Sequence, residues 1–150
     1  MRTFILLIIV FFCSSQVFAG DIKDSSVPAK VKMYVTNHFP KASGIEWDFK
    51  KDDNLYEAEF RIDGLEYKLK ITPEGLLHAS KEDVKIELLP KAAVDYIRKE
   101  YAGYKILGAN KKVKSGKTVY DVGVKGKNSL GHTRHYNLYF DENGKFISVG

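Results

Sequence analysis

Polar and apolar residues alternate with period two in several short segments of the chain. In "YEAEFRI" the apolar side chains occupy every second position from Tyr56, and in "LEYKLKI" they do so from Leu65. The segment around Trp47 follows the same rule. Such alternation is typical of antiparallel strands with one face in a core and the other in water. We therefore predict strands near 45–49, 56–62 and 65–71.

The second half of the chain carries a looser version of the same alternation. It predicts strands near 104–113, 118–125, 134–140 and 145–149. Glycine-containing turn sequences separate the strands of both halves, among them Asp63-Gly64, "TPEG", Ser115-Gly116 and "DENG". The segment "SKEDVKIEL" at 80–88 keeps the alternation at Val84 and Ile86, and we interpret it as the final strand of the first half.

Two segments show the helical period instead. Val31, Val35 and His38 lie on one face of a helix near 28–39, and Ile97 and Tyr101 lie on one face of a helix near 90–101. Each helix would carry a proline in its first turn, where the missing N–H costs no hydrogen bond. Pro40 and Gly103 would end the two helices.

The two halves repeat one pattern. Residue pairs such as Pro28/Pro90 and Phe39/Tyr101 keep a spacing of 62, which grows to 64 and then to 69 in the later strands because the second half has longer hairpin loops. We predict an α+β fold of two tandem units, 27–87 and 88–150, each a helix packed on an antiparallel sheet of three to four strands. The side chains expected to be buried are Trp47, Phe49, Phe60, Leu69, Ile97, Tyr120 and Leu138.

The first residues resemble an export signal. A basic Arg2 precedes an apolar run at 4–12, and small residues follow at Ala19 and Gly20. The run is shorter than the roughly 20 residues that span a membrane. We predict a signal peptide at 1–19 cleaved after Ala19, an N-terminal extension at 20–26, and a periplasmic or secreted product without a membrane span. The single cysteine, Cys13, would be removed with the signal, so no disulfide or thiol nucleophile would remain.

Charge is unevenly distributed over the predicted mature chain. Residues 20–87 have 11 Lys/Arg and 14 Asp/Glu, a net charge of −3, whereas residues 88–150 have 12 and 5, a net charge of +7. A basic half can indicate nucleic-acid binding. Solvated strand faces and turn lysines explain it better in an exported protein, and we expect no nucleic-acid partner.

Several of these motifs occur together in one known family. A proline-led helix with an aromatic residue at its end, a W-x-F strand at Trp47, Y-x-A-x-F from Tyr56 and a D-x-x-G hairpin resemble the PepSY-like, β-lactamase-inhibitor-like exported proteins. The resemblance covers 27–149. It implies tandem units and a binding or inhibitory role, with no catalytic residues to transfer. The second unit departs from the pattern, because "NKKVKS" stands where the tryptophan strand is expected.

Chemical motifs are weak in this sequence. The segment "GKNSLGHT" at 126–133 is one residue from a phosphate-binding loop, but it lies between two predicted strands and lacks the lysine. His132 and His135 would point to opposite sides of a strand, with no cysteine to complete a zinc site. Glu57 and Glu59 could serve a carboxylate-based hydrolase, but lysines and Arg61 lie among them. We assign no catalytic, cofactor-binding or metal-binding residue.

The sheet faces not covered by helices are the best candidate for function. Most tyrosines fall on apolar faces, whereas Tyr139 alternates with the polar residues and is expected to face outward. We predict a non-enzymatic exported binding module whose partner is a protein of the cell envelope, with inhibition or regulation of a periplasmic or secreted hydrolase as one role. The alternatives are an envelope structural protein and a carboxylate-based hydrolase. The candidate partner-binding residues are Glu57, Glu59, Arg61, Asp121, His135 and Tyr139.

Overall fold

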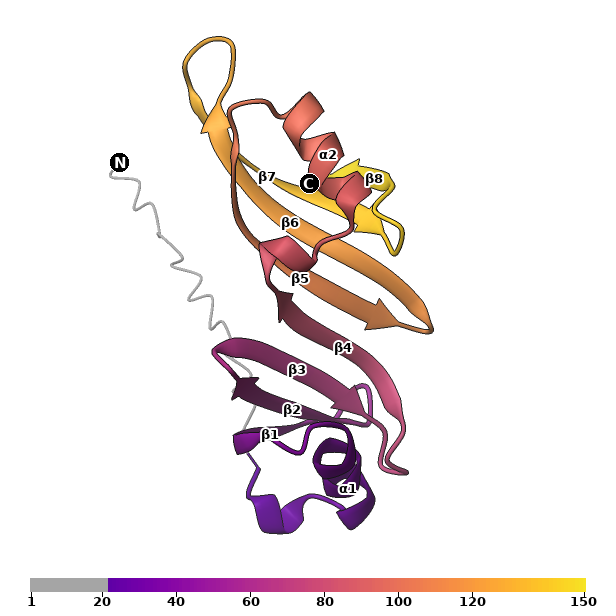
Figure 1. Cartoon of the computed structure of the whole chain (residues 1–150). Coiled ribbons are helices and arrows are strands. Elements are labelled where there is room, and N and C mark those ends of the chain that lie inside the picture. The colour runs from indigo at the N-terminus through magenta and orange to yellow at the C-terminus, as the bar shows by residue number, and fades with distance from the viewer. Residues whose placement is uncertain (1–21) are drawn as a thin grey trace, which may run out of the picture.

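Eight β-strands form one antiparallel sheet in which the order along the chain is also the order in space (Figure 1). The computed structural model describes residues 22–150, so the predicted signal peptide and its cleavage after Ala19 lie outside the described residues. The strands are β1 (Ser43–Lys50), β2 (Leu55–Ile62), β3 (Leu65–Ile71), β4 (Leu77–Val84), β5 (Lys105–Lys114), β6 (Lys117–Lys127), β7 (Thr133–Asp141) and β8 (Phe146–Val149).

The two predicted helices are present as α1 (Ala29–His38) and α2 (Lys91–Glu100). Pro28 and Pro90 precede the first helical turn instead of lying within it, because their ψ angles of 142° and 131° are extended. Their carbonyl oxygens nevertheless accept the first helical hydrogen bonds, from Lys32 at 3.2 Å and from Val94 at 3.3 Å. α1 ends at His38 and α2 at Glu100, and an aromatic C-cap residue, Phe39 or Tyr101, follows each helix ahead of the predicted breakers Pro40 and Gly103.

Both helices pack on the same face of the sheet. Residues paired directly across an antiparallel ladder point to the same side. Leu69, which packs beneath α1, is opposite Ser80, and Ser80 is opposite Val113 on β5. Val113 shares its side of the strand with Ala109, which packs beneath α2. Within residues 22–150, no helix therefore lies on the opposite face of the sheet.

The core consists of two separate clusters of buried side chains. The first joins α1 to β1–β3 through Val27, Val31, Val35, Trp47, Ala58, Phe60, Leu69 and Ile71. The second joins α2 to β5–β7 through Leu89, Ala93, Ile97, Ala109, Val122, Val124, Leu138 and Phe140. Between the two clusters the helix-bearing face carries an ion pair of Glu82 and Lys111 at 3.1 Å. Pairing of β4 with β5 thus joins two cores without merging them.

Most of the predicted core residues are buried, and two are not fully so. Phe49 and Tyr120 are half-buried. Phe49 lies on the edge strand β1, where its ring contacts Tyr56 with centroids 4.8 Å apart. The expected counterpart of Trp47 is Ala109, a spacing of 62 away, and Val84 of β4 lies directly opposite it. In the second half, the Val84 side chain of β4 thus lies beside the small Ala109, at the position equivalent to Trp47 of β1.

The bounds of the strand predicted at 80–88 differ from those in the structure. β4 begins earlier, at Leu77, and ends at Val84, after which Ile86–Leu88 form a short 3₁₀ helix, η2. An equivalent turn, η1 (Asp24–Ser26), precedes α1 at a spacing of 62. The chain turns at η2 because it must leave the sheet to bring Leu89, which is buried, and α2 over the strands.

Candidate partner-binding face

Alternation along the strands gives the face without helices, called here the helix-free face, an almost entirely polar surface. On β2 the apolar residues Ala58 and Phe60 face α1, so Glu57, Glu59 and Arg61 face the other way. The register continues this division across the sheet. Arg61 is opposite Glu66, and Asp121 is opposite both Asn110 and Tyr139.

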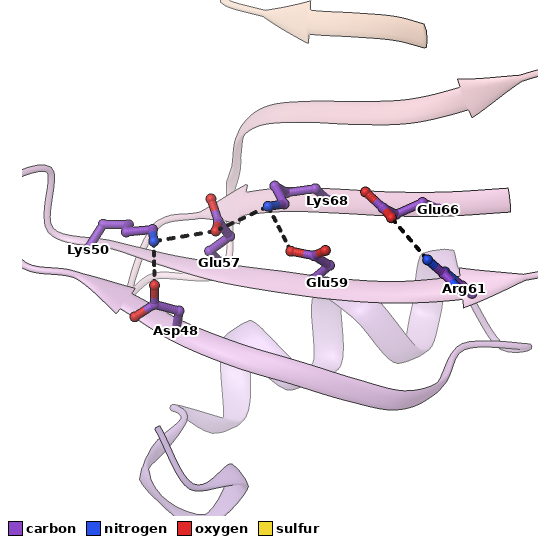
Figure 2. A network of polar contacts seen from close by, with 7 residues as sticks. All are labelled: Asp48, Lys50, Glu57, Glu59, Arg61, Glu66 and Lys68. Atoms are coloured by element: carbon purple, nitrogen blue, oxygen red, sulfur yellow. Dashed lines mark hydrogen bonds and ion pairs between the residues drawn. The ribbon is translucent and has the colours of Figure 1, made fainter. Parts of the chain in front are cut away.

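A network of ion pairs covers the β1–β3 part of this face (Figure 2). The Lys50 ammonium contacts Asp48 and lies 3.5 Å from Glu57. The Lys68 ammonium lies 2.7 Å from Glu59 and 3.8 Å from Glu57, so it bridges the two carboxylates. Figure 2 shows these side chains on one side of the strands with the helix behind them.

The network favours the charged form of both lysines. The hydrogen bond to Asp48 raises the pKa of Lys50, and the hydrogen bond to Glu59 raises the pKa of Lys68. In both cases partial burial acts in the opposite direction and is outweighed. The Glu57 side chain is 12% exposed and that of Glu59 is 37% exposed, so Glu59 is the more accessible of the two carboxylates.

Arg61 and Glu66 form the outer part of the network. Their side chains are 3.4 Å apart, and the Arg61 side chain is 74% exposed. The backbone N–H of Glu66 donates a hydrogen bond to Asp83 of β4 at 3.1 Å. Arg61 is thus available to a partner, whereas Glu66 is tied to the next strand.

The β6–β7 part of the face holds the other three predicted residues. Asp121 is paired with Lys112 at 2.6 Å and is only 13% exposed. His135 is exposed. Tyr139 lies on the predicted side of β7 but is half-buried: the Lys112 ammonium is 5.7 Å from its ring centre, and Gly150 is so near that a Cβ added there would lie 3.2 Å from the ring. Tyr139 thus lies on the helix-free face, but its ring is less exposed than expected.

The structure brings all six predicted residues onto one continuous surface. The sequence predicts them on two units and leaves open whether the two sheets are continuous; the pairing of β4 with β5 makes them one sheet. The sequence does not show that lysines of three neighbouring strands adjoin at the centre of this surface. Lys68 is directly opposite Lys81, and Lys81 is directly opposite Lys112. Alternation marks each of them as polar, but only the register between strands shows that they adjoin.

The remaining motifs form ordinary structural features. Residues 128–132 form the β6–β7 hairpin loop, in which the Asn128 side chain accepts hydrogen bonds from the backbone N–H groups of Leu130 and His132 at 3.0 Å each. A strand follows this loop, so the helix N-terminus that a phosphate-binding loop requires is missing. Within residues 22–150, no three His, Cys, Asp or Glu side chains are grouped so as to hold a metal ion, and no helix is long and apolar enough to cross a membrane.

Comparison with protein families gives two matches in tandem, at residues 17–79 and 76–148, to one family described as "Putative beta-lactamase-inhibitor-like, PepSY-like". The chain belongs to the PepSY-like family. The two PepSY-like matches together span nearly the whole described chain, which confirms the resemblance and the internal duplication seen in the sequence. A search of curated proteins finds no significant match.

Solved structures share this PepSY-like fold. A DUF2874 family protein from Bacteroides uniformis is 21% identical, with a TM-score of 0.63 over 82% of this chain and 88% of that one. A protein from Bacteroides eggerthii described as a "putative periplasmic" protein is 19% identical, with a TM-score of 0.63 over 83% and 88%. A BLIP-like protein from Bacteroides fragilis is 19% identical, with a TM-score of 0.62 over 82% and 85%. At these identities the likeness concerns the fold.

Proposed function

We propose that the chain is an exported, non-enzymatic binding module that holds a protein of the cell envelope against its helix-free face. The observation that supports the proposal is the extent of that face: it spans eight strands, no helix of residues 22–150 lies over it, and all six candidate residues are on it. The family's inhibitor-like description and the BLIP-like neighbour support a binding role. Inhibition or regulation of a periplasmic or secreted hydrolase is the specific form that we favour.

The proposed module consists of two units, 27–87 and 88–150, each with one helix on its own four strands of the shared sheet. Each buried cluster contains residues of one helix only, which supports this division. The two family matches overlap at 76–79, at the start of β4, which is earlier in the chain than the proposed boundary. In either division, β4–β5 pairing is the link between the units.

Export is the second part of the proposal. The basic and apolar start of the sequence and the periplasmic description of a structural neighbour support a signal peptide at 1–19. N-terminal sequencing of the protein recovered from the periplasm or medium should give Gly20 as the first residue. A start at Cys13 or an intact Met1 would contradict cleavage after Ala19.

A carboxylate-based hydrolase is the enzymatic alternative. Such an enzyme needs one carboxyl group as a protonated acid and a cleft that holds the substrate. Glu57 and Glu59 instead share the ammonium of Lys68 on a sheet surface. Turnover of a peptide, β-lactam or glycan substrate that is abolished by Glu57→Gln or Glu59→Gln would establish this alternative and overturn the proposed binding function.

Affinity capture from a native periplasmic extract tests the binding face. Arg61→Glu and Glu59→Lys should each reduce the amount of the captured partner at least tenfold, because these side chains project from the helix-free face. Lys99→Glu is the matched control, since Lys99 is 83% exposed on α2. Loss of capture with Lys99→Glu and normal capture with both sheet variants would assign binding to the helices instead. A protein with no partner in such an extract would fit the structural alternative.

A further inference from the structure

At the centre of the helix-free face, lysines of neighbouring strands lie directly opposite one another. Lys68, Lys81 and Lys112 stand side by side on β3, β4 and β5 in successive cross-strand pairs. Next to this row, Lys114 is opposite Ala79 on one side and Lys117 on the other. Like charges placed directly opposite on a sheet destabilise it.

Internal acids compensate only part of this charge. Lys68 is paired with Glu59, and Lys112 is paired with Asp121. Lys81, which stands between them, has no ion pair within residues 22–150, and neither has Lys114 on the same part of the chain. Both are exposed. Lys81, in the middle of the row, is therefore available to pair with an anionic group of another molecule.

The same lysines surround a depression in the surface. Ala79 lies between Lys70 and Lys114 across the strands, and its small side chain leaves space there. The depression has a volume of about 270 Å³, and its exposed lining is apolar, formed in part by the aliphatic stems of five lysines: Lys68, Lys70, Lys81, Lys112 and Lys114. We call this depression the lysine hollow; the charges that it offers to a ligand are the ammonium groups at the ends of these stems.

The surroundings of the lysine hollow restrict the shape of its ligand. Three of the lining lysines are paired with acids outside it: Lys68 with Glu57 and Glu59, Lys70 with Asp53, and Lys112 with Asp121. A long polyanion that crossed the sheet would approach these acids and be repelled. A compact acidic group with basic residues on either side would instead meet opposite charge along its whole length.

We propose that the lysine hollow receives an acidic loop of the protein partner, with its Asp or Glu carboxylates between Lys81 and Lys114. The inference rests on the proposed function and specifies the chemistry of the partner. Lysine suits this role because its ammonium acts as a mobile point charge that can approach carboxylates in several geometries. The repulsion among the lysines is relieved when the carboxylates arrive, which favours the bound state.

A defined peptide tests the proposal without the natural partner. The probe is a cyclic peptide with three consecutive glutamates flanked by lysines, and its control has glutamines in place of the glutamates. In an NMR titration at low salt, the acidic peptide should shift the amide signals of β4 and β5 around Ala79 and Lys114, and the glutamine peptide should not. Lys81→Gln combined with Lys114→Gln should weaken binding at least tenfold. Lys85→Gln combined with Lys99→Gln, which removes the same charge elsewhere, should leave it unchanged.

Three results would overturn the lysine hollow as an acidic-loop site. In the first, the two double variants weaken peptide binding equally. In the second, the peptide shifts amide signals only at other lysines. In the third, dextran sulfate binds the same residues more tightly than the peptide does. If the peptide titration gives one of these results while Arg61→Glu still abolishes capture of the native partner, that combination would reject the acidic loop as the ligand and leave the proposed binding function intact.

The free protein provides an independent measurement. Lys81→Glu places a carboxylate between Lys68 and Lys112, and it should raise the Tm by about 2–4 °C at low salt. The gain should nearly vanish at about 1 M salt, where exposed charges are screened. A fall in the Tm at low salt would show that the lysines do not repel one another and would remove the basis of the proposal.

Discussion

Gly75 and Gly144 occupy equivalent places in the last hairpin turn of each half. Both have positive φ angles, 85° and 81°. A Cβ added to Gly75 would lie 2.7 Å from the carbonyl oxygen of Lys30 in α1, and one added to Gly144 would lie 2.8 Å from the backbone nitrogen of Ala93 in α2. The repeated turn therefore touches the first turn of the repeated helix, which explains why each half keeps a glycine there.

Alanine substitutions should separate the effect of this contact from that of backbone strain. We expect Gly75→Ala and Gly144→Ala each to lower the free energy of unfolding by about 2–4 kcal/mol, because a left-handed backbone and a backbone clash combine. Gly116→Ala is the control, with φ 72° but no atom within 4 Å of the added Cβ, and should cost only about 1 kcal/mol. Urea denaturation measures all three. Equal costs would mean that the contact with the helices contributes nothing.

Each helix ends over a layer of aromatic rings. Phe39 lies over Phe60 and Tyr67, with ring centres 5.2 and 5.4 Å away, and Tyr101 lies over Tyr104 and Tyr136, at 5.5 and 5.8 Å. Burial raises the pKa of Tyr67 and of Tyr101 above the ordinary value of 10.0. Removal from water disfavours the tyrosinate form.

The raised tyrosine pKa values predict a loss of stability in alkali. A tyrosine whose pKa is higher in the folded than in the unfolded chain contributes its full stability below pH 10.0. That contribution decreases as the pH rises above this value. The Tm should thus fall above pH 10, and Tyr67→Phe combined with Tyr101→Phe should make the fall smaller. An identical alkaline fall in the double variant would contradict burial as its cause.

The molecule as a whole contains two cores on one side of one sheet. Phe60 belongs to the cluster under α1, and Leu138 belongs to the cluster under α2. Both side chains are nearly inaccessible to water, with exposures of 3% and 0%. The polar pair of Glu82 and Lys111 lies between the clusters.

Truncation in both clusters tests whether they are energetically separate. Phe60→Ala and Leu138→Ala should each cost about 2–5 kcal/mol through lost burial and a cavity. In the double variant the two costs should add to within about 0.5 kcal/mol, as they do for sites without shared contacts. Leu69→Ala combined with Phe60→Ala is the comparison within one cluster and should deviate more. Strong non-additivity between Phe60 and Leu138 would indicate one continuous core.

The sequence by itself determined the helices, most strand positions and the duplication. Periods of 3.6 and 2 residues identify which side chains share a face, and prolines and glycines mark where elements begin and end. These signals are local, so a single chain is enough to see them. They also indicated the family, and they placed Glu57, Glu59 and Arg61 on a solvated face.

Only the tertiary structure decided how the two halves join and what their common surface presents. Strands pair through backbone hydrogen bonds that are the same for every sequence, so alternation does not show that β4 pairs with β5. That pairing makes one sheet, puts both helices on one side and sets Lys81 between Lys68 and Lys112. The register of β5, β6 and β7 likewise explains Tyr139, which alternation places on the correct face but which Lys112 of β5 partly covers. Period-two alternation fixes the side of the sheet on which a residue lies, whereas its neighbours depend on register across the sheet.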